Sequence, residues 1–119
     1  MRKVQRGDVV VVNFPYSDQT GSKKRPALVV QDDRWNAILD DTIVAFITSG
    51  THRYVGAATQ KLIRHGSPEH KGSGLRTDSV VECQTLLTCD QSLITAIIGQ
   101  LSAGVMNDVD DCLRATLGL

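Results

Sequence analysis

Cysteines, aromatic side chains and long apolar runs are all scarce in this chain of 119 residues, and the shortages exclude several classes of protein. Its three cysteines, Cys83, Cys89 and Cys112, are odd in number and show no CxxC or Cys/His spacing. A disulfide framework or a zinc site is therefore not expected, and free thiols indicate a cytoplasmic protein. No run approaches the roughly 20 apolar residues of a membrane helix. The basic start is followed by a short apolar run interrupted by Asp8 and Asn13, which does not resemble a signal peptide.

An excess of charge of one sign is also lacking, because 13 basic residues balance 13 acidic ones. Eleven of the 13 basic residues nevertheless lie in two segments, residues 2–25 and 53–76. The acidic residues gather elsewhere, mainly in residues 32–41 and 108–111. If the two basic segments meet in the fold, they form a face suited to a polyanion. Scattered, solvated charge is an equally good interpretation.

Motifs for metals and nucleotide cofactors are absent from the sequence. The three histidines, His52, His65 and His70, have no predicted strand or helix that holds two of them on one face. No GxxxxGK[ST], GxGxxG or GxSxG pattern occurs. The sequence therefore predicts no metal site and no cofactor.

Short β-branched runs separated by turn residues predict five or six strands. The expected strands cover residues 8–14, 26–31, 42–48, 58–63, 79–87 and 95–101. A loop of about ten residues is expected before Pro26, which is acceptable at the first position of a strand, and residues 64–78 read as a second loop. After Ser102, a plausible N-cap, an apolar stripe from Val105 to Leu117 predicts one terminal helix. The expected fold is mainly β, a small antiparallel barrel with a C-terminal helix, in one domain over residues 1–119.

Two residues are candidates for chemistry on their position alone. Arg25 stands where the predicted loop meets a buried strand, so Pro26 would fix a guanidinium able to hold a phosphate by two parallel hydrogen bonds. Thr48 ends another predicted strand and offers a hydroxyl to the same phosphate. Lys23 and Lys24, in the loop, would add salt-sensitive attraction for a phosphate backbone. Taken singly, a solvated arginine and a threonine chosen for β propensity explain the pattern as well.

Four stretches together make the sequence recognisable. They are RGDVVVVNFPYSDQTGSKKRPALVVQDD, VAFITS, GLRTDSVVECQTLLTCD and GQLSAGVMNDVDDCL, in that order. They resemble the MazF/PemK family of toxin endoribonucleases, the toxins of type II toxin–antitoxin modules. The resemblance implies an SH3-like barrel of the CcdB/MazF kind, a homodimer, and a cognate antitoxin as partner. It also implies sequence-specific, metal-independent cleavage of single-stranded RNA, as by an mRNA interferase.

The family's catalytic pair corresponds to Arg25 and Thr48. The resemblance implies that a ribose 2′-OH attacks the adjacent phosphorus, that Arg25 neutralises the phosphoryl charge, and that Thr48 holds the phosphate in line. Further RNA contacts are expected from Asp18, Gln19, Lys23, Lys24, Ser49, Arg76, Asp78 and Gln84. Unpaired bases could stack on Tyr16, Trp35 and Tyr54, although packing on the barrel fits Trp35 better.

The general base stays open, because this chain departs from its relatives in two places. Glu82 and Gln84 replace an Arg and an Asp that some relatives use, and the first loop lacks another group's glutamate. Asp18, Asp78 and Glu82 are candidates on chemical grounds, whereas the Gln84 amide cannot accept the proton. A competing interpretation is a barrel without catalysis that captures a protein such as gyrase.

Overall fold

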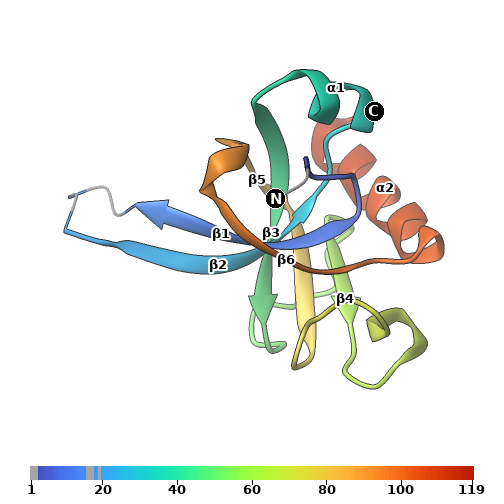
Figure 1. The fold of residues 1–119 in the computed structure, drawn as a ribbon. Coiled ribbons are helices and arrows are strands. Elements are labelled where there is room, and N and C mark those ends of the chain that lie inside the picture. Colours follow the sequence, from blue (N-terminus) through green and yellow to red (C-terminus); the bar gives the residue numbers. More distant parts are fainter. Residues whose placement is uncertain (1–2, 16–17, 19) are drawn as a thin grey trace.

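The computed structural model describes residues 3–15, 18 and 20–119. Six strands form one antiparallel sheet in the order β4-β5-β3-β2-β1-β6, and a C-terminal helix packs against it (Figure 1). The strands are β1 (Asp8–Pro15), β2 (Ser22–Val29), β3 (Asp41–Ser49), β4 (Gln60–Ile63), β5 (Ser79–Asp90) and β6 (Ile94–Gln100). The helices are α1 (Asp33–Ile38) and α2 (Ala103–Leu117), with short 3-10 turns η1 (Pro68–His70) and η2 (Gln91–Leu93). The prediction of a mainly β fold ending in a helix is confirmed.

The sheet is open, so the predicted closed barrel is not what the described residues form. Strands β4 and β6 are its two edges. The segment that follows η1 approaches the β6 edge instead, and the Gln100 amide donates to the carbonyl of Gly72 at 2.9 Å. This backbone contact covers part of the edge without adding a strand pair, which is one way in which a protein protects an exposed edge.

Successive side chains of a strand point to opposite faces of the sheet, and each face has its own apolar cluster. One face packs against α2 and buries a cluster that includes Val9, Leu28, Ala45 and Ile47. The opposite face carries a smaller cluster, Val4, Val10, Val12, Ala27, Val29, Val44, Cys89 and Ile94. Leu93 of η2 packs against this second cluster, whereas α2 lies on the other face.

Helix α2 forms where the apolar stripe predicted it. The Ser102 hydroxyl accepts a hydrogen bond from the backbone of Val105, as an N-cap should, and Gly118 ends the helix in the left-handed conformation. The stripe residues Val105, Met106, Val109 and Cys112 are buried, whereas Leu117 is 56% exposed. The apolar stripe therefore faces the core over the first ten residues of the helix and leaves it near the end.

The cysteines are buried free thiols, as predicted. Burial raises the pKa of Cys83 to about 12, so this thiol is protonated at neutral pH. In the part of the chain that the structure describes, no helix is both long enough and apolar enough to span a membrane.

Helix α1 was not expected from the sequence. Asp32 caps it by accepting a hydrogen bond from the backbone of Arg34. The buried Asn36 holds the helix against β3 by accepting a 2.7 Å hydrogen bond from the Thr42 hydroxyl. A helix of six residues is too short to show an apolar period, so only its cap residue could have signalled it. Trp35, expected to pack on the barrel, lies in this helix and is 48% exposed.

The basic triplet lies inside a strand, which corrects the predicted loop. Strand β2 begins at Ser22 rather than at Pro26, and Lys23, Lys24 and Arg25 pair with Phe14, Asn13 and Val12 of β1. Pairing with β1 imposes the extended conformation, which lysines do not favour by themselves. Pro26 therefore does not define where the strand starts, and Arg25 is held in the strand by its pairing with Val12 of β1. The hairpin projects from the body of the sheet (Figure 1).

Acidic groups of α2 neutralise part of both basic segments. Arg6 forms a 2.6 Å ion pair with Asp110, and Lys61 contacts both Asp108 at 2.8 Å and Glu69. These pairs contradict a simple division into a basic and an acidic face. Scattered charge is the interpretation that the described residues support, apart from the hairpin.

Candidate active site

Arg25 and Thr48 stand on the same face of the sheet, where β2 and β3 separate. The last pair between these strands is Ala27–Phe46, and Arg25 and Thr48 each lie two residues beyond it. Residues at this spacing share a face, so the two side chains would be direct cross-strand neighbours if pairing continued. Instead β2 leaves with β1, while β3 continues beside β5 (Figure 1). The two predicted catalytic residues therefore lie on opposite sides of the gap where β2 and β3 separate.

The Arg25 guanidinium rests on an aromatic ring and is otherwise available. Its central carbon lies 5.2 Å from the centre of the Phe46 ring, which in turn packs on Phe14 with 5.0 Å between ring centres. Within residues 3–15, 18 and 20–119, no hydrogen bond or ion pair engages the guanidinium. A cation on an aromatic face is attracted by about 0.5–1 kcal/mol at partly exposed sites, which restricts its orientation without using its donors. All five N–H groups remain available to an anion.

Thr48 is paired with a buried carboxylate. Its Oγ1 donates a 2.7 Å hydrogen bond to Oε2 of Glu82, which lies on the neighbouring strand β5. Thr48 is 9% exposed and Glu82 only 4% exposed. No sequence pattern predicts this contact, since 34 positions separate the two residues.

Three further side chains surround Glu82. Arg53 approaches its Oε1 with Nε at 3.4 Å, and the Gln84 amide is at the same distance from that oxygen. Burial opposes ionisation, but the hydrogen bond from Thr48, the charge of Arg53 and the amides of Gln60 and Gln84 outweigh it and lower the pKa of Glu82. The site thus contains a carboxylate that stays ionised although it is buried.

Replacing Arg53 by glutamine is expected to raise the pKa of Glu82. The substitution removes the positive charge that favours the carboxylate, while burial continues to favour the neutral acid. Carbon-detected NMR titration of the glutamate side chains would measure the change, with Glu69 as the internal reference because it is the only other glutamate. An unchanged titration of Glu82 would contradict the electrostatic role of Arg53.

A bulge in β5 explains why Glu82 points to this face. Ala45 pairs with Leu86, but the next residue, Phe46, pairs with Glu82, so three residues of β5 have no pairing partner in β3. This odd offset reverses the alternation, and Leu86 packs on the α2 side while Glu82 lies on the opposite face with Phe46. Gln84 is exposed within the bulge.

The other predicted site residues are dispersed over the molecule. Asp18 is exposed in the hairpin turn, where hydrogen bonds from the backbone and hydroxyl of Thr20 lower its pKa. Asp78 accepts a 2.7 Å hydrogen bond from the backbone of His65 and so fixes a loop. Both features make these acids weaker candidates for a base than Glu82.

Among the predicted RNA contacts, Lys23 shares the face of Arg25, whereas Lys24 points to the other face. Ser49 ends β3 on the face opposite to Thr48, and Arg76 is exposed in the loop before β5. Gln19, together with Tyr16, lies outside the described residues. Tyr54 is 39% exposed in the turn that follows β3.

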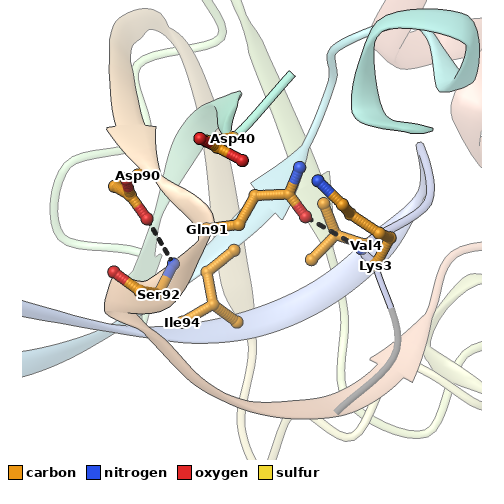
Figure 2. A pocket seen from close by; sticks show the side chains of 7 residues that line it. All are labelled: Lys3, Val4, Asp40, Asp90, Gln91, Ser92 and Ile94. Carbon is orange, nitrogen blue, oxygen red and sulfur yellow. Dashed lines mark hydrogen bonds between the residues drawn. The ribbon is translucent and has the colours of Figure 1, made fainter. Parts of the chain in front are cut away.

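A pocket of about 630 Å³ lies beside η2, and none of the predicted site residues lines it (Figure 2). Several of its polar groups already have partners. The Gln91 Oε1 accepts from the backbone of Val4 at 3.3 Å, Asp90 accepts from the backbone of Ser92 at 2.8 Å, and Lys3 donates to the carbonyl of Leu39 at 2.9 Å. These bonds join the N-terminal segment to η2 and α1, so the pocket has a structural explanation.

Residues 5–117 match the family model described as PemK-like, MazF-like toxin of type II toxin-antitoxin system. The chain is 33% identical over 119 residues to endoribonuclease EndoA of Bacillus subtilis, covering 98% of this chain and 96% of that protein. A mycobacterial endoribonuclease in complex with its cognate antitoxin superposes with a TM-score of 0.77 at 20% identity, over 98% of this chain and 96% of that one. The MazE–MazF crystal structure from Deinococcus radiodurans gives 0.76 at 24% identity, over 99% of both chains. These structural likenesses bear on the fold.

Proposed function

Because the chain belongs to the family of PemK-like, MazF-like toxins of type II toxin–antitoxin systems, we propose that it is an endoribonuclease that cleaves single-stranded RNA at short sequence motifs without a metal ion. The relative from Bacillus subtilis is named an endoribonuclease and aligns with nearly the whole chain. The proposed reaction is attack of a ribose 2′-OH on the adjacent phosphorus, with departure of the 5′-oxygen. The products are a 2′,3′-cyclic phosphate, or the 3′-phosphate formed when it opens, and a 5′-hydroxyl.

The observation that carries this proposal is the shared position of Arg25 and Thr48, each two residues beyond the last β2–β3 pair on one face. A phosphate placed between the separating strands would meet an unpaired guanidinium from one side and a hydroxyl from the other. The guanidinium presents parallel N–H groups that match two phosphoryl oxygens, and the charge on these oxygens grows as the 2′-oxygen attacks. Arg25 thus stabilises the transition state, and Thr48 orients the ribose for in-line attack.

The hairpin would guide RNA to this point. Lys23 is exposed on the face of Arg25, and Lys24 is exposed on the other side of the same strand. Cations at these places attract the phosphate backbone without reading its sequence. Gln84, exposed beside Glu82, has an amide that can read a base edge, and Tyr54 offers a surface for stacking.

An antitoxin and a second copy of the chain are the proposed protein partners. Some of the structural relatives are complexes with an antitoxin, as in the mycobacterial pair. Exposed apolar side chains, among them Ile38, Val55 and Leu119, are surfaces that such partners could cover. The proposed working form is a cytoplasmic homodimer of a single toxin domain. The alternative of a barrel without catalysis that captures gyrase has no support among the named relatives, which are endoribonucleases.

A pool of long single-stranded RNAs incubated with the protein in excess chelator tests this function. The expected result is a limited set of cuts whose mapped 5′ ends share one short motif. Retention of full activity in the chelator is also expected, because the proposed groups are all side chains. Intact RNA over a wide range of protein concentrations would contradict the assignment.

A further inference from the structure

The only proton of the Thr48 hydroxyl is already in use. Oγ1 donates it to Oε2 of Glu82 at 2.7 Å, and an ionised carboxylate can only accept. Thr48 therefore cannot donate to a phosphate oxygen while this bond exists. Its oxygen lone pairs remain, and they make Thr48 an acceptor for a hydroxyl group. The contact thus changes the chemistry expected of Thr48 from phosphate donor to proton acceptor.

Glu82 is suited to receive a proton but not to meet RNA directly. It is 4% exposed, and it lies behind Thr48 on the next strand of the sheet. The charged and polar groups that face it are Arg53 from the turn after β3, Gln60 from β4 and Gln84 from its own strand. They keep the carboxylate ionised, which is the form a base needs. A proton can reach this carboxylate from the separation between β2 and β3 through the hydroxyl of Thr48.

We propose that Thr48 and Glu82 form a proton relay, in which Glu82 is the final acceptor of the proton that the ribose 2′-OH loses. The relay rests on the proposed function and supplies the general base that the sequence left open. It assigns Thr48 to direct contact with the substrate and Glu82 to a place behind it. Asp18 and Asp78, held by local hydrogen bonds, are not needed as bases.

The relay moves two protons in one step. The 2′-oxygen forms its bond to phosphorus while its proton passes to Thr48 Oγ1. The former Thr48 proton passes along the existing hydrogen bond to Oε2 of Glu82. The bond between phosphorus and the 5′-oxygen breaks, and the departing oxygen takes a proton from water. The hydroxide left behind then takes the proton from Glu82, which restores the carboxylate. Arg25 stays charged throughout and balances the negative charge on the phosphoryl oxygens.

The Glu82→Gln variant tests whether Glu82 acts as a base or only supports the structure. Glutamine has the same shape, and its amide oxygen can still accept the Thr48 hydrogen bond, but it cannot take up a proton at neutral pH. With an RNA oligonucleotide that has one mapped cut, and in excess chelator, we expect kcat to fall by about 10²-fold or more with little change in KM. Glu69→Gln, the matched change in the other glutamate, should cleave at the wild-type rate. A Glu82→Gln enzyme with near wild-type kcat would overturn the relay.

A double-mutant cycle with Thr48→Val tests whether the two residues act as a unit. Because both serve one proton path, the double variant should be no slower than the slower single variant. Losses that multiply would mean independent roles and would overturn the relay.

The wild-type enzyme provides a test that does not depend on the folding of any variant. If two protons move in the same step, a plot of the single-turnover rate against the deuterium fraction of the solvent should be curved. A straight line would overturn the relay. A wild-type protein without any cleavage activity would overturn the proposed function, and the relay with it. Activity that requires Arg25 but not Glu82 would overturn the relay alone.

Discussion

Replacing Arg25 by alanine is expected to slow RNA cleavage by about 10³-fold while leaving the fold intact. The guanidinium is the group that faces the separation between β2 and β3 without a hydrogen bond or ion pair from the described residues. Its loss removes the positive charge that the transition state requires. The ring of Phe46 beneath it stays packed on Phe14, so the sheet should not change. Single-turnover kinetics in excess chelator measure the rate, and circular dichroism checks the fold.

Two further variants test whether the loss of activity is specific to the guanidinium of Arg25. Arg34→Ala removes an exposed arginine of helix α1 that, like Arg25, lies over an aromatic ring, 5.8 Å from the ring centre of Trp35. It should retain the wild-type rate. Arg25→Lys keeps the charge but loses the paired N–H geometry, so it should remain slow. Cleavage by Arg25→Ala at the wild-type rate would remove Arg25 from the reaction.

Replacing Gly74 by alanine is expected to cost about 3 kcal/mol or more of unfolding free energy, the largest stability effect predicted for a conservative change. Its φ is +73°, and an added Cβ would lie only 2.1 Å from the carbonyl oxygen of Ile98 in β6. The backbone must therefore move, and the loop that covers the β6 edge would separate from it. Gly99→Ala should act in the same way from the other side, because its Cβ would lie 2.3 Å from Ser73.

Urea denaturation can separate this crowding from effects of backbone conformation. Gly56 has a φ of +70° but nothing within 4 Å of an added Cβ, so Gly56→Ala should cost only about 1 kcal/mol. Gly104, in the first turn of α2, has neither constraint, and Gly104→Ala should be neutral or slightly stabilising. If Gly74→Ala unfolds at the same urea concentration as Gly56→Ala, the close approach to β6 does not contribute to stability.

Elements with strong local patterns could be predicted from the sequence. Strand β1 is a continuous β-branched run, and α2 combines an N-cap at Ser102 with an apolar stripe, so both were placed within a residue or two. Strand β2 begins four residues before its predicted start. Cross-strand pairing with β1, rather than any preference of its lysines, makes residues 22–25 extended. Helix α1 depends on a cap and a buried asparagine, which leave almost no periodic signal.

Only part of the candidate site could be predicted from the sequence, for a similar reason. Arg25 and Thr48 correspond to a family pattern, and the structure places them on one face where two strands separate. The partnership of Thr48 with Glu82 could not be predicted, because it depends on the bulge that reverses the alternation of β5. Arg53 and Gln60 reach Glu82 from segments that no spacing rule connects with it. Long-range contacts that follow from irregular pairing are beyond sequence patterns.

In the proposed reaction the ribose 2′-OH is the nucleophile, and side chains alone perform the catalysis. The most direct measurement uses an RNA oligonucleotide with one mapped cut and a second copy that carries a single 2′-deoxynucleotide on the 5′ side of that bond. In excess chelator, we expect cleavage of the first with a 2′,3′-cyclic phosphate or 3′-phosphate end, and no cleavage of the second at that bond. Equal cleavage of both oligonucleotides would contradict it.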